Sequence, residues 1–523
     1  MNILIAAAEN DALPDGKVGG IGDVIRDVPP ALAAAGHSVH VLTPGYQAFS
    51  KATGAKHVTN LQVRFRGAQE TVSIFKVQAM NPHQNVTLWV VEHPLFAAGG
   101  VGKIYSEDPP NRPFATDASK FALFSAAVAT SVISNIFGSI EVLHLHDWHS
   151  AMVAMLRAFD PLYKSLQPIH TVYTIHNLSL QGVRPLAGDL SSLQSWFPDL
   201  QYDPVQLNDP RAPHCINPMR IGIKLSDKVH AVSPSYAKEI QLASNLEQGY
   251  FGGEGLELDL QSAAAEGRLH GILNGCEYPE QSLKTLPIFE LLSSCESELL
   301  KWIANKPQVE SAALVAISRI TQLMRTLDST VNSQSILVTS VGRITEQKIL
   351  LLQQRMASGE SAIDQLLTVL GHSGLFIMTG SGDHELEQFL TRVAARHKNF
   401  IFLKGYSDRI SDLLYDNGDL FLMPSSFEPC GISQMLAMRR GQPCLVHSVG
   451  GLKDTVINNK NGFCFNGNSL QIQAKNMILC FEQALHTKQN NAKKWQAIAR
   501  AAANSRFPWS EVAADYLRLL YSK

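Results

Sequence analysis

The sequence predicts an α/β protein built from two doubly wound parallel sheets, each in its own domain. Short β-branched runs alternate with helical stretches along most of the 523 residues, a pattern typical of parallel strands covered by helices on both faces. Eleven such runs occur, which is more than one doubly wound sheet usually holds. Ligands bind at the carboxyl ends of the strands in such sheets. We therefore expect two Rossmann-like domains that face each other across a deep cleft.

The expected strands fall into two series separated by residues 277–334, which read as helical. The first series comprises Ile3–Ala7, Val39–Leu42, Val86–Val91, Val142–Leu145, Val172–Ile175 and Val229–Val232. The second comprises Ile336–Val341, Leu375–Met378, Phe400–Leu403, Leu420–Met423 and Cys444–Val446. We place the domain boundary near Gly275, so that residues 1–275 and 276–507 form the two domains. Residues 508–523 follow as a C-terminal amphipathic helix that packs near the domain junction.

Composition and charge exclude several classes of protein. With 45% hydrophobic and 17% charged residues the composition is that of a soluble globular protein. The 44 basic and 46 acidic residues leave a formal net charge of −2, which argues against a nucleic-acid partner. Residues 2–8 are apolar but lack a basic flank, so they read as a buried strand rather than a signal peptide, and no stretch is apolar enough to span a membrane. Seven cysteines without a CxxC pair favour reduced thiols in the cytoplasm.

A glycine-rich loop, Lys17-Val-Gly-Gly-Ile-Gly-Asp-Val, follows the first strand and precedes a helix. Glycines let a ligand approach the backbone, and the N–H groups at a helix N-terminus attract anions. The dinucleotide fingerprint G-x-G-x-x-G fails because Ile25 stands where the third glycine belongs. The loop could also be a plain βα turn without a ligand. We favour a loop that contacts a phosphate or a sugar, in which Lys17 provides the positive charge.

Two polar segments end neighbouring strands of the first series. His144-Leu-His-Asp-Trp-His149 and Thr174-Ile-His-Asn177 each follow an apolar run. A zinc site is disfavoured because neighbouring side chains of a strand point to opposite faces and the H-E-x-x-H pattern is absent. We therefore predict no metal site, and expect Asp147 and His176 to face ligand hydroxyl groups in the cleft.

The second half carries two further candidate segments. Arg343 and Lys348 lie where a strand enters a helix, and fixed positive charge there suits a diphosphate. The string Pro424-Ser-Ser-Phe-Glu-Pro-Cys-Gly-Ile-Ser433 leaves a strand, turns, and enters a helix near Ser433. It places the Glu428 carboxylate beside exposed backbone N–H groups. Taken alone, both segments are also compatible with solvated or purely structural turns.

Together these strings resemble the bacterial glycogen synthase and plant starch synthase family. The family's motifs occur in the correct order over nearly the whole chain, at Lys17–Val24, His144–His149, Thr174–Asn177, Ala231–Tyr236, Ile272–Gly275, Arg343–Lys348, Phe427–Gly431 and Gly450–Val456. The resemblance implies a GT-B fold and a retaining α-glucosyltransferase. Its donor would be ADP-glucose, or alternatively UDP-glucose, and its acceptor the non-reducing end of an α-1,4-glucan. It implies neither a cofactor nor a metal.

The resemblance also implies roles for individual residues. In the first domain, which would bind the acceptor, Lys17, Gly19 and Gly20 close over the donor phosphates. His176 would lie at the transferred glucose and Asp147 on the acceptor side. In the second domain, which would bind the nucleotide sugar, the implied residues are Arg343 and Lys348 at the diphosphate, Glu428 at the glucose hydroxyls, backbone groups of Cys430, Gly431 and Ser433 around sugar and phosphate, and Tyr406 stacked on the base.

Some positions depart from the family pattern. Val18 stands where the family usually has Thr, and Ile349 where it has Gly. Position 435 is Met, so the paired glutamates of some related transferases are absent, as in the bacterial family. Two alternative hypotheses are that the protein is a catalytically silent glucan-binding relative or that it is a Rossmann oxidoreductase. The retained charged residues disfavour the first, and the failed fingerprint disfavours the second.

Overall fold

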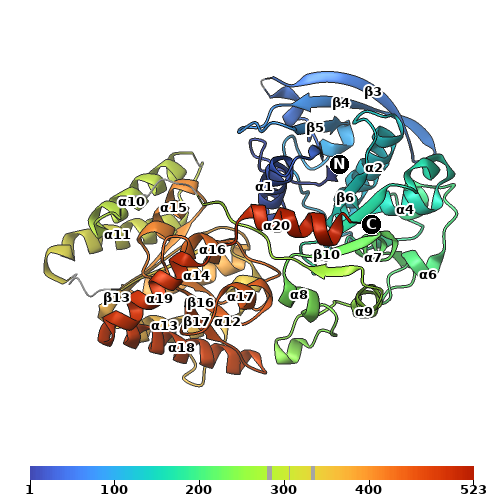
Figure 1. Ribbon diagram of the computed structural model, residues 1–523. Coiled ribbons are helices and arrows are strands. Elements are labelled where there is room, and N and C mark those ends of the chain that lie inside the picture. The colour runs from blue at the N-terminus through green and yellow to red at the C-terminus, as the bar shows by residue number, and fades with distance from the viewer. Residues whose placement is uncertain (53, 279–284, 306, 331–335, 523) are drawn as a thin grey trace. The chain divides into compact units, whose positions relative to one another are not determined.

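The computed structural model describes residues 1–52, 54–278, 285–305, 307–330 and 336–522 (Figure 1). The chain divides into two compact units. Unit 1 consists of Met1–Ser244, Gly252–Gly275 and Pro508–Lys523, and unit 2 of Asn245–Phe251 and Cys276–Phe507. None of the helices described combines the length and apolar character needed to cross a membrane.

Unit 1 contains a nine-stranded sheet with the order β11-β10-β7-β6-β1-β2-β5-β4-β3. Its strands are β1 (Asn2–Ala6), β2 (Ser38–Pro44), β3 (Lys56–Phe65), β4 (Ala68–Val77), β5 (Val86–Glu92), β6 (Val142–His146), β7 (His170–Ile175), β10 (Lys228–Ala231) and β11 (Leu269–Gly271). All neighbours pair in parallel except β3–β4 and β4–β5, which are antiparallel. A separate pair joins β8 (Arg184–Pro185) to β9 (Cys215–Ile216). The parallel strands β7, β6 and β1 are adjacent, so their carboxyl ends share one edge.

Helices cover this sheet. They are α1 (Gly20–Ala34), α2 (Ala115–Ile133), α3 (Asp147–Ser150), α4 (Met152–Phe159), α5 (Leu193–Trp196), α6 (Pro204–Leu207), α7 (Pro218–Leu225), α8 (Pro234–Glu239) and α9 (Glu257–Ala265). Short 3₁₀ turns occupy Phe49–Lys51, Pro94–Ala97 and Pro161–Leu166. Helix α2 is buried along nearly its whole length, which explains why its sequence lacks a separate charged, solvent-facing side.

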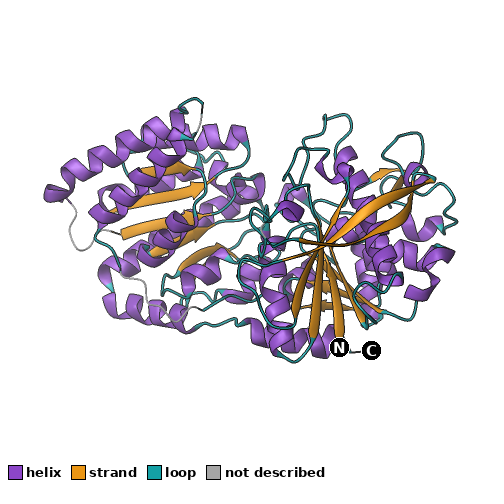
Figure 2. Cartoon of the chain, turned by 90° about the horizontal axis from the view of Figure 1, so that it is seen from above, coloured by secondary structure: helices purple, strands orange, loops and turns teal. Residues whose placement is uncertain are grey.

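Unit 2 contains a six-stranded, all-parallel sheet with the order β14-β13-β12-β15-β16-β17. The strands are β12 (Ile336–Val341), β13 (Gly374–Gly380), β14 (Phe400–Lys404), β15 (Leu420–Met423), β16 (Cys444–His447) and β17 (Gly462–Phe465). Successive residues of β12 alternate between two apolar cores, with Ile336 and Val338 in one and Leu337 and Val341 in the other. Figure 2 shows helices on both faces of this sheet.

The helices of unit 2 are α10 (Ile288–Ala304), α11 (Ser311–Thr330), α12 (Glu346–Gln353), α13 (Ala362–Leu370), α14 (His384–Arg396), α15 (Asp408–Asn417), α16 (Ser433–Met438), α17 (Gly450–Thr455), α18 (Leu470–Asn490) and α19 (Ala492–Asn504), with 3₁₀ turns at Leu246–Gln248 and Gly371–Ser373. Helices α10 and α11 lie in the segment predicted to be helical. Residues 279–284, 306 and 331–335 of that segment lie outside the described residues.

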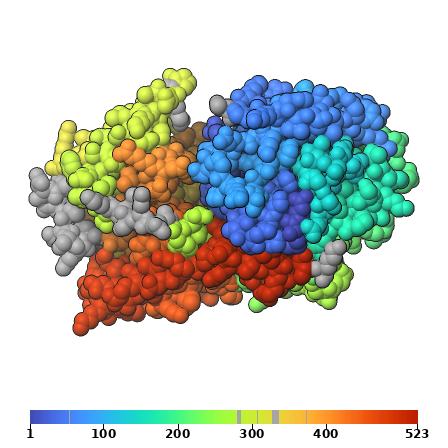
Figure 3. All heavy atoms as spheres, turned by 45° about the horizontal axis from the view of Figure 1, so that its top comes forward, coloured from blue at the N-terminus to red at the C-terminus, as the bar shows by residue number. Residues whose placement is uncertain are grey.

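The end of the chain returns to unit 1. Helix α20 (Trp509–Asp515) is followed by a π-helical turn, Tyr516–Leu520, where the sequence predicted one continuous amphipathic helix. Helix α20 lies beside α1 (Figure 1), and in Figure 3 red residues of the chain's end lie next to dark-blue residues near its beginning. The Trp509 indole donates a hydrogen bond to the Asp27 carboxylate at 3.0 Å. The last segment is therefore part of the unit 1 core.

The structure confirms all eleven predicted strands and the two doubly wound sheets. It adds strands that were not predicted, above all the antiparallel hairpin of β3 and β4 at one edge of the nine-stranded sheet. This hairpin extends an otherwise parallel sheet without changing the edge at which the predicted site residues lie.

Candidate functional site

The glycine loop after β1 is held by a buried carboxylate, Glu9. The side chain of Glu9 is 2% exposed, and its Oε2 accepts hydrogen bonds from the backbone N–H groups of Val18 at 2.8 Å and Gly19 at 2.6 Å. Its Oε1 accepts a hydrogen bond from the Tyr105 hydroxyl at 2.7 Å. Because these two amides are occupied by Glu9, the amide of Gly19 is not available to a phosphate in this state.

Gly20, the next residue, lies open. It begins α1, and a methyl group built on its Cα would meet no atom within 4 Å. The packing of the protein therefore does not require glycine here, whereas close approach of a ligand to the helix N-terminus would. The ammonium group of Lys17 lies 2.5 Å from Asp23 Oδ1 and 3.9 Å from Asp11 Oδ2. To bind an anion, Lys17 has to turn away from these carboxylates.

Tyr105, which supports Glu9, is itself fixed by a buried ion pair. Lys120 is 0% exposed and pairs with Asp117 at 2.8 Å. Its ammonium group donates to the carbonyl of Ile104 at 2.7 Å, and the Asp117 carboxylate accepts from the N–H of Ser106 at 3.0 Å. The residues on both sides of Tyr105 are thus anchored, since a buried charge is stable only when paired.

Asp147 lies at the start of α3, directly after β6, with a positive φ of 50°. Its side chain is only 4% exposed, and Oδ1 accepts a hydrogen bond from the backbone N–H of His176 at 2.7 Å. Burial raises the pKa of this carboxyl group to about 8. In the structure Asp147 therefore holds the backbone at the end of β7.

His176 follows β7 and is 9% exposed. Its Nε2 lies 2.9 Å from Nδ1 of His146, the last residue of β6. Burial lowers the pKa of His176 to about 3, so the ring is neutral. The structure thus brings His176, Asp147 and the glycine loop to the same edge of the sheet, at the ends of adjacent strands.

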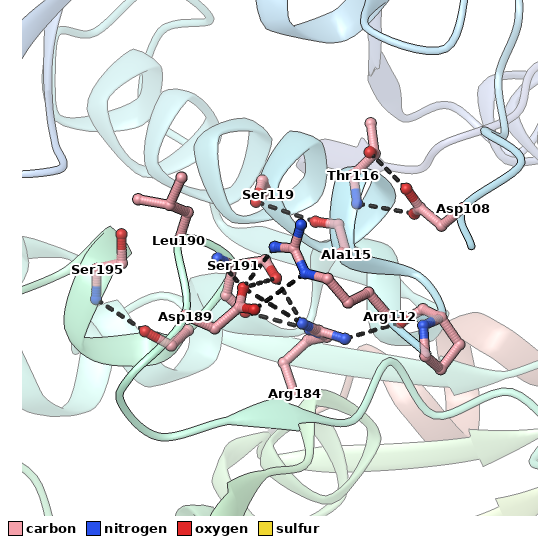
Figure 4. A network of polar contacts seen from close by, with 12 residues as sticks. Asp108, Arg112, Ala115, Thr116, Ser119, Arg184, Asp189, Leu190, Ser191 and Ser195 are labelled. Carbon is pink, nitrogen blue, oxygen red and sulfur yellow. Dashed lines mark hydrogen bonds and ion pairs between the residues drawn. The ribbon is translucent and has the colours of Figure 1, made fainter. Parts of the chain in front are cut away.

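The chain after His176 is held in place by a polar network (Figure 4). Arg112 donates two hydrogen bonds to the Asp189 carboxylate, at 2.8 and 3.0 Å. Arg184 donates to the Ser191 hydroxyl at 2.6 Å and to the Pro113 carbonyl at 2.9 Å. The hydrogen bonds from Arg112 lower the pKa of Asp189. Two loops distant in sequence, one before α2 and one after β7, are thereby fastened together.

In unit 2 the central contact joins Lys348 to Glu428. Lys348 Nζ lies 2.9 Å from Glu428 Oε2, which also accepts a hydrogen bond from the Ser425 hydroxyl at 3.0 Å. Glu428 is 8% exposed. Lys348 comes from the first turn of α12 and Glu428 from the loop after β15, and strands β12 and β15 are neighbours in the sheet. Arg343, on the loop after β12, is exposed.

Two further contacts shape the loop that carries Glu428. The backbone carbonyl of Gln347 accepts from the N–H of Ser426 at 2.8 Å, and the Gln347 amide donates to the Phe427 carbonyl at 2.8 Å. On the other side, a Cβ added to Gly450 would lie 1.9 Å from the Glu428 carbonyl oxygen, and Gly450 has a φ of +43°. Only glycine allows α17 to approach this loop so closely.

The residues after Glu428 complete the loop. Cys430 is buried, Gly431 adopts a φ of +75°, and Ser433 begins α16. The N–H of Gly451 donates to the Glu428 carbonyl at 3.1 Å. The loop is thus constrained from both ends.

Tyr406 lies apart from this cluster. It follows β14, which is separated from β12 by β13, and its side chain is 59% exposed. The Tyr406 hydroxyl donates to Asp408 Oδ1 at 2.6 Å. Behind it, the backbone of Gly405 packs on the Trp302 indole of α10, because a Cβ on Gly405 would lie 2.7 Å from that ring.

One sizeable cavity lies away from these residues. It has a volume of about 620 Å³ and opens at the amino ends of the unit 1 strands, among Met1, Glu141, His170 and Tyr521. None of the site residues predicted from the sequence lines this cavity. No group of three or more His, Cys, Asp or Glu side chains suited to a metal ion occurs within the described ranges.

Sequence reasoning missed Glu9, Tyr105, Ser425 and Gln347. The available signal for Glu9 was an acidic residue at the carboxyl end of a buried strand, the same signal that identified Asp147. The contacts of Tyr105 and Gln347 join segments far apart in the chain, and no local pattern predicts them.

Comparisons with known proteins agree with this arrangement. Residues 2–262 match the family model described as the starch synthase catalytic domain, and residues 328–501 match that of glycosyl transferases group 1. Glycogen synthase of Francisella philomiragia is 30% identical over 97% of this chain and 97% of its own. Glycogen synthase of Streptococcus equi subsp. zooepidemicus is 30% identical over the whole of both chains.

Among solved structures, the catalytic domain of starch synthase IV from Arabidopsis thaliana, bound to ADP and acarbose, superposes with a TM-score of 0.75. It is 25% identical and covers 99% of this chain and 98% of its own. The fold is thus the GT-B fold expected from the sequence. With full-length identity of 30% to curated glycogen synthases and a starch synthase domain over its first half, this chain belongs to the glycogen synthase family of glucosyltransferases.

Proposed function

We propose that this glycogen synthase-family enzyme takes glucose from ADP-glucose and adds it to the non-reducing end of an α-1,4-glucan. Membership of the family already implies a nucleotide-sugar donor and a glucan acceptor. The choice of ADP is supported by the Arabidopsis relative, which binds ADP and is similar over 99% of this chain. Within the chain, the proposal depends chiefly on the contact between Lys348 and Glu428.

The residues of unit 2 act on the donor. Negative charge develops on the diphosphate as its bond to glucose breaks, so the fixed positive charges of Arg343 and Lys348 stabilise the leaving group. Glu428, oriented by Ser425 and Lys348, accepts hydrogen bonds from the glucose hydroxyl groups. Backbone N–H groups of the constrained loop contribute donors, at Cys430, Gly431 and Ser433.

The residues of unit 1 act on the phosphates and on the reacting glucose. Lys17, released from Asp23, and the open backbone of Gly20 contact the phosphates, while Gly19 serves to shape the loop through Glu9. His176 lies at the glucose that is transferred. Asp147 holds the His176 backbone, so we propose that it positions His176 in addition to facing the acceptor.

The base of the donor stacks on Tyr406. This side chain is exposed, and the backbone of the preceding residue, Gly405, packs on the Trp302 indole. A purine offers the ring a larger face than uracil, and such stacking contributes ~1–3 kcal/mol per base. We therefore expect a preference for ADP-glucose rather than exclusion of UDP-glucose.

Comparing kcat/KM for the two donors tests this proposal. The parent enzyme should favour ADP-glucose, and Tyr406→Ala should lose more activity with ADP-glucose than with UDP-glucose. A parent that prefers UDP-glucose would overturn the choice of donor. If neither donor extends a labelled glucan, the transferase role itself fails for this chain.

We also propose that the reaction needs no cofactor and no metal ion, since the nucleotide sugar is itself the activated substrate. Activity should persist in EDTA, and complete, reversible loss would contradict this. A cytoplasmic location is supported by the seven cysteines, all of which are free thiols.

A further inference from the structure

A layer of buried polar side chains crosses three neighbouring strands of unit 1. His144 of β6, Thr174 of β7 and His230 of β10 are each 0% exposed. His144 Nε2 lies 2.6 Å from Thr174 Oγ1, which lies 3.0 Å from His230 Nδ1. At one end of the layer His230 Nε2 lies 3.0 Å from the Ile272 carbonyl, and at the other His144 Nδ1 lies 2.8 Å from the Tyr521 hydroxyl.

Only one assignment of donors and acceptors satisfies all of these hydrogen bonds. The Ile272 carbonyl can only accept, so His230 carries its proton on Nε2 and its Nδ1 accepts from the Thr174 hydroxyl. Thr174 has then used its single proton and accepts from Nε2–H of His144. The remaining nitrogen of His144 accepts from the hydroxyl of Tyr521. Burial lowers the pKa of both histidines, that of His230 to about 4, which keeps both rings neutral as this assignment requires.

His146 is held against this layer. Its ring stacks on that of His144 with a centroid distance of 4.4 Å and an interplanar angle of 28°. His146 is 1% exposed, and its Nδ1 lies 2.9 Å from Nε2 of His176. Its other nitrogen, Nε2, is buried without a hydrogen-bond partner in the part of the chain that the structure describes.

The unpartnered nitrogen decides which ring donates. If His176 donated from Nε2, His146 would have to carry its own proton on its buried, unpartnered Nε2. A buried N–H without an acceptor costs more than a bare lone pair without a donor. His146 therefore carries its proton on Nδ1 and donates it to Nε2 of His176. Because His176 is neutral, its proton then resides on Nδ1.

We propose that His146 is a positioning residue that fixes His176 as the tautomer protonated on Nδ1, so that His176 offers an N–H donor to an oxygen of the transferred glucose. This inference rests on the proposed place of His176 at that glucose. Removing a donor of this kind from a transition state typically costs ~10²–10³ in rate. His146 is buried and acts through His176.

Two substitutions at position 146 separate this role from packing. The amide nitrogen of Asn occupies nearly the place of the histidine Nδ1, whereas that of Gln occupies the place of Nε2. His146→Asn therefore keeps the donor to His176, and His146→Gln loses it although it fills more of the space. We expect kcat of the Asn variant to exceed that of the Gln variant by about tenfold or more, equivalent to one hydrogen bond, with similar KM for the donor. If packing were the cause, the Gln variant would be the more active one, and that order would overturn the proposal.

The tautomer of His176 can also be determined by NMR, without an activity measurement. In protein labelled with ¹⁵N-histidine, the two ring nitrogens differ in chemical shift according to which one carries the proton. Signals of His176 are identified by their loss in His176→Asn. The parent and His146→Asn should show His176 protonated on Nδ1, and His146→Gln should show proton on Nε2 or a mixture. A parent with the proton on Nε2 contradicts the inference.

The same variants distinguish this inference from the proposed function. Replacement of His176 by Ala tests whether the residue acts on glucose at all. If His176→Ala keeps full turnover while the parent shows the Nδ1 proton, the proposed role of His176 is wrong and the tautomer assignment stands. If His176→Ala is inactive and the two position-146 variants rank in the opposite order, the positioning role of His146 is wrong. Melting temperatures of all variants show whether each one is folded.

Discussion

The ammonium nitrogen of Lys348 lies 2.9 Å from Oε2 of Glu428, although the two residues belong to different elements that are 80 positions apart in the chain. The pair is partly buried, with side chains 22% and 10% exposed. Each residue therefore orients the other, and a change in either one affects both.

Glu428→Ala should lower turnover by ~10²–10³, because a contact that strengthens in the transition state is lost. Glu428→Gln keeps the shape and tests the charge. Measuring kcat and KM for the donor alongside the melting temperature separates catalysis from folding.

Lys348→Gln should lower kcat as well as donor affinity, and a variant with raised KM and unchanged kcat would show that Lys348 contributes uniform binding only.

Glu9→Ala should impair the glycine loop. It leaves the N–H groups of Val18 and Gly19 and the hydroxyl of Tyr105 without their acceptor, and each unsatisfied buried group costs ~1–3 kcal/mol. We expect kcat/KM for the donor to fall by at least about tenfold, while Glu9→Gln, which keeps an oxygen for both amides, retains most of it. Hydrogen exchange of the Val18 and Gly19 amides should accelerate in the Ala variant. Exchange at the parent rate would show that Glu9 does not hold the loop.

Gly20→Ala should separate stability from activity. The added methyl meets no atom of the protein, and Ala at a helical position is favoured over Gly by ~0.5–1 kcal/mol. The melting temperature should thus stay the same or rise slightly, while donor binding weakens because the ligand can no longer approach the backbone. Val18→Ala, at the exposed neighbouring position, is the matched control. Normal affinity for the donor in Gly20→Ala would remove Gly20 from the binding site.

The free energy of unfolding should depend on pH through the buried histidines. Burial lowers the pKa of His144, His146, His149, His176 and His230 in the folded state, to about 3 for His149 and His176 and about 4 for His230. Between pH ~4 and ~6.5 the unfolded chain then binds more protons than the folded one, so stability is lost as pH falls through this window. Asp147, with its pKa raised to about 8, opposes this trend because it stays protonated in the folded state while the unfolded state releases its proton. The contribution of five buried imidazoles nevertheless exceeds that of one carboxyl group.

Urea unfolding at pH 5 and at pH 7 measures the effect. His149→Phe should reduce the difference in the free energy of unfolding between the two pH values, because it replaces one of the buried titratable imidazoles by a ring that does not titrate. His384→Gln, which changes an exposed histidine, should leave the difference unchanged. Equal stability of the parent at both pH values would contradict the assignment of these histidines as neutral.

Much of the candidate site could be predicted because it lies at strand ends. Polar residues that directly follow an apolar run mark the carboxyl edge of a parallel sheet, and this rule pointed to Asp147 and His176. Glu428 was predicted from the turn with Pro429 and Gly431 that lies between a strand and a helix. Neither pattern could reveal what these side chains contact. Asp147 turned out to hold the backbone of His176, a contact that depends on its left-handed φ of 50° rather than on any sequence pattern.

Other features left weak signals or none. The β3–β4 hairpin is exposed on one face, so its strands lack the continuous apolar run that identified the others. Its turn, Arg66-Gly67, has positive φ at both residues, and a two-residue turn of this type is the signal that could have found it. The contact of Tyr521 with His144 joins residues 377 positions apart, and no local rule connects them.

The discontinuity of unit 1 has a consequence for biosynthesis. Segment Pro508–Lys523 belongs to unit 1, yet it is translated only after all of unit 2. Until then the ribosome-bound chain lacks the hydrogen bond from Trp509 to Asp27 and the one between Tyr521 and His144. The nascent first unit therefore lacks two of its buried hydrogen bonds, and it can complete its core only when segment Pro508–Lys523 has left the exit tunnel. Unit 2, whose residues are by then all synthesised, is free to fold first.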